Sequence, residues 1–143
     1  MNRLRILTVG CGLLSIVFGG CLYLLYRSET LLIFKWIKVM GIYDFISVLR
    51  PDNGINSWFV YSLPDGLWLF SYIMIISAIW CFDIRKSLLY SVPLVIIAIG
   101  SEILQIPHIV SGTFDFIDLW CYIVATILGY VYMIIINNKL KRI

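Results

Sequence analysis

GSEILQIPHIVSGTFDFIDLW, residues 100–120, joins the end of one long apolar segment to the beginning of the next. Pro107 stands between the two segments, with Glu102 before it and Asp115 and Asp118 after it. A carboxylate at membrane depth is costly and is usually retained because it has a partner or a task. The acidic residues of this stretch are therefore the first candidates for a functional site.

The composition around this stretch is that of a membrane protein. The chain has 143 residues, of which 62% are hydrophobic, and its mean hydropathy is +0.97. Soluble domains are about 45–50% apolar. We therefore expect an all-α integral membrane bundle with membrane lipids as its surroundings. The net charge of +3 is small and no long basic face occurs, so nucleic acid is not expected as a partner.

Four apolar segments are long enough to cross a hydrocarbon core of about 30 Å. They cover residues 6–26, 66–82, 87–106 and 116–136. The segment 30–49 is also rich in aromatic and aliphatic residues, but Lys35, Lys38 and Asp44 interrupt it. This pattern is typical of an amphipathic helix in the headgroup region. The sequence thus predicts one membrane domain, 1–143, with four transmembrane helices and an interfacial helix.

The distribution of Lys and Arg predicts the orientation. With four spans, the two termini and the second loop share a side. Seven basic residues fall on that side: Arg3, Arg5, Arg85, Lys86, Lys139, Lys141 and Arg142. Four fall on the other side: Arg27, Lys35, Lys38 and Arg50. The positive-inside rule then favours cytoplasmic termini.

In this orientation the carboxylates of the spans gather toward the outer face. Residues three or four apart share a helix face, so three helices each present a polar stripe. We expect these stripes to face one another around a small outward-facing polar site. Its candidate residues are Asp65, Tyr72, Glu102, Gln105, Asp115, Asp118 and Tyr122.

A purely structural interpretation also applies to several of these residues. Asp65 and Asp115 can each satisfy free N–H groups at a helix start. Glu102 lies about a turn and a half inside its segment, and is harder to explain in this way. No HExxH, GxSxG, P-loop or nucleotide fingerprint is present. No cofactor is expected, while catalytic residues and a cation site remain open.

The motif Glu102-Ile-Leu-Gln105, followed by Asp118 and a span that carries Gly129, resembles the VanZ-like family of small bacterial membrane proteins. Asp65 with Tyr72 is similar to that family's earlier aspartate-led span, and the resemblance covers about residues 60–132. The family often has a histidine at the position of Leu69, an arginine near Thr113 and an asparagine at Tyr122. The resemblance implies a role at the cell envelope, and the founding member is associated with teicoplanin resistance.

Three functions therefore stand as hypotheses. The first is a VanZ-like protein whose acidic site binds or acts on a lipid-linked envelope component, or blocks an amphiphilic glycopeptide antibiotic. The second is a small transporter or proton-coupled protein that uses Glu102. The third is a membrane scaffold without a catalytic site. Whether the protein is an enzyme, and its oligomeric state, stay open.

Overall fold

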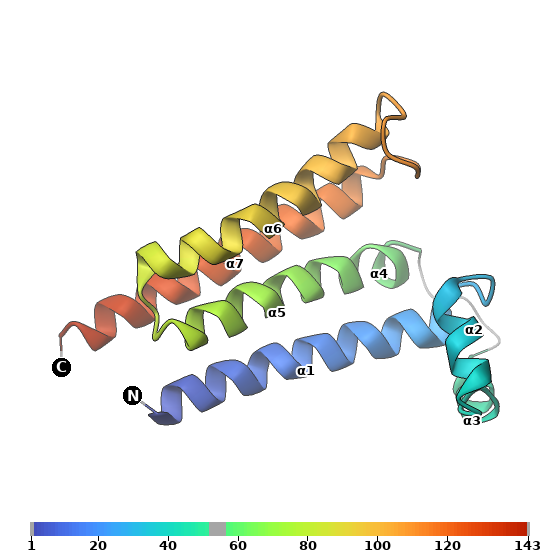
Figure 1. Ribbon diagram of the computed structural model, residues 1–143, viewed down its shortest axis with the longest axis horizontal. Coiled ribbons are helices and arrows are strands. Elements are labelled where there is room, and N and C mark those ends of the chain that lie inside the picture. Colours follow the sequence, from blue (N-terminus) through green and yellow to red (C-terminus); the bar gives the residue numbers. More distant parts are fainter. Residues whose placement is uncertain (1, 52–56, 143) are drawn as a thin grey trace.

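The computed structural model describes residues 2–51 and 57–142, and these residues form seven helices (Figure 1). The helices are α1 (Asn2–Tyr26), α2 (Leu32–Val39), α3 (Tyr43–Leu49), α4 (Ser57–Tyr61), α5 (Leu63–Ile79), α6 (Ile84–Gln105) and α7 (Phe116–Leu140).

The all-α membrane bundle predicted from the sequence is confirmed. Four helical stretches of the described chain are long and apolar enough to cross a membrane: Arg3–Tyr26, Phe59–Ile79, Ile84–Gln105 and Phe116–Leu140. The protein is thus a multi-pass membrane protein. The second span begins and ends earlier than the expected 66–82, because α4 leads directly into α5 and a tight turn follows Ile79.

α5 is the central helix of the bundle and contacts α1, α6 and α7. Small residues permit these close approaches. The Ser71 hydroxyl donates to the Gly12 carbonyl across the α1–α5 interface at 2.8 Å. A Cβ on Gly129 of α7 would lie 2.8 Å from Ile73 Cγ2, so α5 and α7 pack with almost no space between them. Close backbone packing of this kind is a main source of helix association in membranes.

A tight turn joins α5 to α6 at the end of the bundle that holds both termini (Figure 1). Cys81 and Phe82 both adopt left-handed backbone conformations, with φ of 53° and 61°. The surroundings stabilise this costly geometry. The Phe82 side chain is fully buried, its N–H donates to the Ser77 carbonyl, and its carbonyl accepts from the Asn137 amide of α7 at 2.7 Å.

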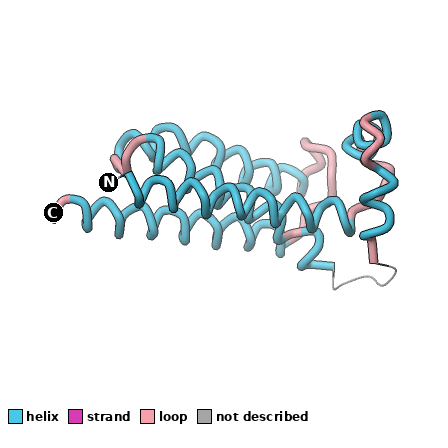
Figure 2. The backbone as a smooth tube through the Cα atoms, turned by 90° about the horizontal axis from the view of Figure 1, so that it is seen from below, coloured by secondary structure: helices cyan, strands magenta, loops and turns pink. Residues whose placement is uncertain are grey.

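At the opposite end, α2 and α3 run across the end of α1 (Figures 1 and 2). We call residues 28–50 the elbow. The sequence predicted a single helix over 30–49, whereas the structure has two short ones. The difference lies at Gly41, whose φ of +71° is incompatible with a continuous right-handed helix.

Side chains attach the elbow to α1. The Arg50 guanidinium donates to the carbonyls of Leu24 and Arg27, at 2.9 and 2.7 Å, and so satisfies carbonyls at the C-terminal end of α1. Within the elbow, the side chains of Phe34 and Ile37 are buried, while those of Trp36 and Phe45 remain largely exposed. Exposed aromatic side chains on short helices that cross the bundle end suit the headgroup region.

A hydrogen bond also closes the elbow on itself. The Tyr43 hydroxyl donates to the Glu29 carboxylate, and Lys38 Nζ lies 3.5 Å from the same oxygen. The Tyr43 bond, and then the charge of Lys38, lower the pKa of Glu29. The same hydrogen bond raises the pKa of Tyr43, because it favours the protonated phenol.

Candidate functional site

The carboxylates of three spans lie together at the end of the bundle opposite the termini. Asp65 comes from the first turn of α5, Glu102 from the last turn of α6 and Asp118 from the first turn of α7. Asp65 interacts electrostatically with both Asp118 and Glu102. We call Asp65, Glu102 and Asp118 the acidic cluster. The sequence placed all three on this side, and the fold brings them into one group.

Glu102 is the most deeply placed member, with only 5% of its surface exposed. Its Oε1 accepts a hydrogen bond from the Asp115 backbone N–H at 2.8 Å, and its Oε2 accepts one from the Gln105 amide at 3.2 Å. Both oxygens of the carboxyl group therefore have protein donors. Glu102 thus ties the end of α6 to the beginning of α7.

Gln105, which donates to Glu102, also contacts the loop that connects α6 to α7. A Cβ on Gly112 would lie only 2.9 Å from the Gln105 side chain, and Gly112 has a φ of +140°. The backbone conformation favours glycine at this position, and the contact shows that the loop packs against the end of the Gln105 side chain. The Gln105 amide therefore lies between the connecting loop and Glu102, to which it donates.

Asp115 and Asp118 have different roles at the start of α7. Asp115 is the N-cap, and its Oδ1 accepts from the Ile117 N–H at 2.8 Å. This is the helix-start role considered from the sequence. Asp118 lies one turn further on. Its Oδ1 is buried and accepts no hydrogen bond from the part of the chain that the structure describes.

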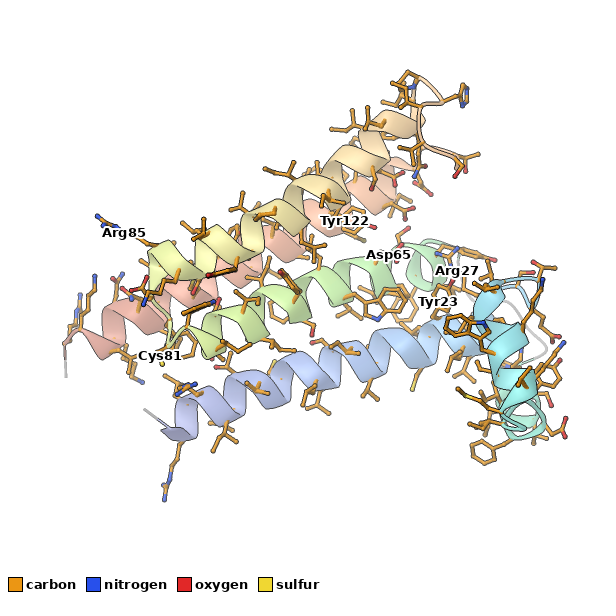
Figure 3. All side chains as sticks on the ribbon, viewed as in Figure 1. Tyr23, Arg27, Asp65, Cys81, Arg85 and Tyr122 are labelled. Carbon is orange, nitrogen blue, oxygen red and sulfur yellow. The ribbon has the colours of Figure 1, made fainter. Side chains whose placement is uncertain are left out.

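Asp65 faces a cation that the sequence reasoning did not assign to the site. Arg27 Nη2 lies 3.9 Å from Asp65 Oδ2 and donates to the Tyr61 carbonyl at 3.0 Å. The guanidinium also lies 4.7 Å from the centre of the Tyr61 ring and 5.3 Å from that of Tyr23 (Figure 3). The aromatic rings and the carboxylate thus hold Arg27 in place.

This ion pair had a signal in the sequence. Arg27 ends the first span and Asp65 begins the second, so an antiparallel pair of spans places both at the same face. From the sequence alone, Arg27 marks only the boundary of the first span and is not among the candidate site residues.

The two tyrosines among the candidate residues have different surroundings. Tyr122 projects from α7 beside the acidic cluster and interacts electrostatically with Asp65, Asp118 and Glu102 (Figure 3). Tyr72 lies two turns further along α5 than Asp65, and its hydroxyl donates to the Tyr90 carbonyl of α6 at 2.8 Å. Tyr122 therefore belongs with the acidic cluster, whereas Tyr72 joins α5 to α6.

An apolar groove runs along α5 and α7 next to the acidic cluster. Its volume is about 400 Å³. It includes Gly66, which follows Asp65, and Cys121, which precedes Tyr122; the other lining residues are Leu63, Leu67, Phe70, Trp120, Val124, Ala125 and Leu128. An apolar groove beside carboxylates suits a molecule that has both an apolar chain and a cationic group.

Within the described residues, no group of three or more His, Cys, Asp or Glu side chains is arranged to hold a metal ion. The arrangement offers negative charge, one unpaired acceptor at Asp118 and an adjacent apolar surface. Comparisons of the chain with known protein families, with curated proteins and with solved structures find no match.

Proposed function

We propose that this chain is a VanZ-like protein of the bacterial cytoplasmic membrane, with cytoplasmic termini and an outward-facing acidic cluster. The cluster binds the cationic group of an amphiphilic component of the cell envelope, and the apolar groove receives its hydrocarbon chain. Binding of an acylated glycopeptide such as teicoplanin, and a contribution to tolerance of it, is the specific form of this proposal.

One observation carries the proposal: carboxylates from α5, α6 and α7 lie at one end of the bundle, near enough for Asp65 to interact electrostatically with the other two, although each is costly at that depth. Among the described contacts, the cation paired with the cluster is Arg27, which lies 3.9 Å from Asp65. Three carboxyl groups beside one guanidinium suit a ligand that brings a further cation.

The three carboxylates of the acidic cluster have different roles in this proposal. Glu102 already accepts two hydrogen bonds, so it holds the α6–α7 corner in place. Asp118 has an acceptor oxygen without a partner among the described residues, so it makes the direct contact with the ligand. Asp65 positions Arg27 and adds negative charge from the facing helix.

A scaffold function is the second candidate, and a specific observation favours it. Glu102 and Asp115 both make short bonds to backbone N–H groups at the same corner. Such bonds stabilise a helix connection without any ligand. Under this alternative, substitution of Asp118 leaves function intact, because the Asp118 side chain makes no such bond within the described part of the chain.

The test is titration of teicoplanin into the purified full chain in phosphatidylcholine nanodiscs. We expect saturable binding that Asp118→Asn weakens roughly tenfold, since a hydrogen bond to a charged group contributes about 1.5–3 kcal/mol. Asp44→Asn is the matched control, because Asp44 is an exposed carboxylate in the elbow. Its affinity should stay within about twofold of the parent.

Two results would contradict the proposal. One is the absence of saturable binding to the parent protein. The other is an equal loss of affinity in Asp118→Asn and Asp44→Asn, since that would indicate general attraction to negative charge.

A further inference from the structure

A second cavity is lined by residues of the turn between α5 and α6 and of the C-terminal part of α7. These segments lie at the end of the bundle that holds the termini, opposite the acidic cluster (Figure 1). Its volume is about 400 Å³, and its wall combines an amide, a carboxylate, an ammonium group and an indole. The lining residues are Ile79, Trp80, Cys81, Asp83, Lys86 and Asn137. None of these residues belongs to the acidic cluster or lines the apolar groove.

Asn137, one of the lining residues, has a buried acceptor oxygen without a donor. Its Nδ2 donates to the Phe82 carbonyl at 2.7 Å, which fixes the orientation of the amide. Its Oδ1 is buried and accepts no hydrogen bond within residues 2–51 and 57–142. A buried amide oxygen without a donor is costly, so a molecule that donates a hydrogen bond here would be favoured.

Asp83 and Lys86 add opposite charges. Asp83 Oδ1 accepts from the Lys86 backbone N–H at 2.9 Å, which caps α6 and fixes the carboxylate. Lys86 Nζ lies 5.4 Å from the centre of the Trp80 ring, and Trp80 in turn stacks on Tyr90 at 4.8 Å. The ammonium group is therefore held beside the cavity by an ordered aromatic pair.

The backbone around the cavity is also fixed. The left-handed residues Cys81 and Phe82 are stabilised by the buried Phe82 ring and by its bonds to Ser77 and Asn137. The cavity is consequently formed before any ligand arrives, which lowers the entropic cost of binding.

The composition of this bundle end indicates the chemical class of the ligand. The sequence places seven Lys and Arg residues at this end, whereas the one acidic residue there is Asp83. Basic pockets between transmembrane helices bind anionic lipid headgroups. The phosphate needs a cation, which Lys86 provides, and a hydroxyl or ammonium group on the same headgroup supplies the donor that Asn137 Oδ1 lacks.

We propose that this cavity binds a phospholipid headgroup that combines a phosphate with a hydrogen-bond donor. Lys86 contacts the phosphate, while Asn137 Oδ1 and the Asp83 carboxylate accept from the donor. Phosphoglycerol, with hydroxyl donors, and phosphoethanolamine, with an ammonium donor, share this chemistry. Phosphocholine does not, because its quaternary nitrogen has no N–H.

Short-chain lipids test the proposal on the purified full chain in detergent. Dihexanoyl phosphatidylglycerol, phosphatidylethanolamine and phosphatidylcholine are titrated separately, and affinity is read from the change in intrinsic tryptophan fluorescence. We expect phosphatidylglycerol, phosphatidylethanolamine or both to bind at least about fivefold more tightly than phosphatidylcholine. The tighter of the two identifies the donor as a hydroxyl or an ammonium group.

Lys86→Gln and Arg85→Gln form a matched pair of variants. Lys86 lines the cavity, whereas the neighbouring Arg85 projects away from the bundle (Figure 3). Loss of the Lys86 charge should weaken binding of the preferred lipid roughly tenfold, and loss of the Arg85 charge by less than about twofold. Equal binding of phosphatidylcholine, or equal losses in the two variants, would overturn the proposal.

Discussion

Glu102 shows how one buried carboxylate organises its surroundings. Its two oxygens accept from the Asp115 backbone and from the Gln105 amide, so its burial is compensated on both sides. The ExxQ spacing of the sequence thus has a direct structural meaning, because residues three apart on α6 place the Gln105 amide on the carboxylate. The partner on the other side, a backbone N–H thirteen residues later, depends on the loop.

Glu102→Gln should lower the stability of the protein. The new NH₂ group would face either the Asp115 N–H or the Gln105 amide, and both of these are donors. One of the two buried hydrogen bonds would then be lost, at a cost of about 1–3 kcal/mol. Thermal unfolding of the purified chain measures the effect. Ser111→Ala, in the exposed part of the same loop, is the control, and an unchanged melting temperature for Glu102→Gln would contradict this role for the carboxylate.

Glu29 provides a pH-dependent prediction in the elbow. Its pKa is lowered by the Tyr43 hydrogen bond and by Lys38, so the stabilisation is present at neutral pH and is lost as the pH falls through this lowered pKa. The sequence contains two glutamates, Glu29 and Glu102. Side-chain ¹³C labelling of glutamate therefore gives two signals, and Glu102→Gln assigns them.

Titration by NMR should show Glu29 releasing its proton below the ordinary value of 4.5. Tyr43→Phe removes the hydroxyl donor and should shift the Glu29 midpoint upward. An identical midpoint in the parent and in Tyr43→Phe would show that the hydrogen bond does not form in solution.

At the scale of helices, small residues determine how closely α5 and α7 approach. A Cβ on Gly66 would lie 3.0 Å from both the Cβ and the carbonyl oxygen of Cys121, whereas Gly100 on α6 has nothing within 4 Å. The backbone oxygen of Cys121 cannot move without the helix. Both glycines occur in spans, but a side chain at Gly66 would meet the neighbouring helix and one at Gly100 would not.

Gly66→Ala should destabilise the bundle by about 1–3 kcal/mol, because the methyl group forces α5 and α7 apart. Gly100→Ala should be neutral or stabilise by up to about 1 kcal/mol through helix propensity. Unfolding of the purified chain in increasing SDS compares the two variants. Equal stability of both would contradict the close α5–α7 contact.

The sequence predicted the helices better than the way in which they join. Length and hydropathy were enough to identify the four spans, since each segment is apolar over its whole length. The break at Gly41 was not predicted, because the apolar pattern continues across it and only the backbone conformation separates α2 from α3. The same holds for Cys81 and Phe82, which are not residue types that favour a left-handed turn.

The site was predicted in part for a similar reason. Asp65, Glu102 and Asp118 could be placed at one end from helix direction alone. Their partners could not, since these are the Asp115 N–H for Glu102 and, for Asp65, the ion-paired Arg27 just beyond the end of α1. Tyr72 shares a helical stripe with Asp65, but the stripe is long enough for Tyr72 to meet α6 instead.

At the scale of the whole molecule, the two ends of the bundle differ in charge. The end with both termini is basic, and the opposite end carries the acidic cluster and the elbow (Figures 1 and 2). A maleimide that cannot cross membranes should label Ser111→Cys in intact cells and Asn138→Cys only after permeabilisation, in a background without the four native cysteines. Labelling of Asn138→Cys in intact cells would reverse the orientation.

The central claim, that the acidic cluster acts on an amphiphile outside the cell, is tested most directly by teicoplanin tolerance. A sensitive bacterial host expresses the parent, Asp118→Asn or Asp44→Asn at equal membrane abundance, and the minimal inhibitory concentration is measured. We predict that the parent and Asp44→Asn raise this concentration by at least about fourfold and that Asp118→Asn does not, because Asp118 has an acceptor without a partner in the described chain whereas Asp44 is exposed in the elbow. Equal tolerance in Asp118→Asn and the parent, or no increase with the parent, would contradict the claim.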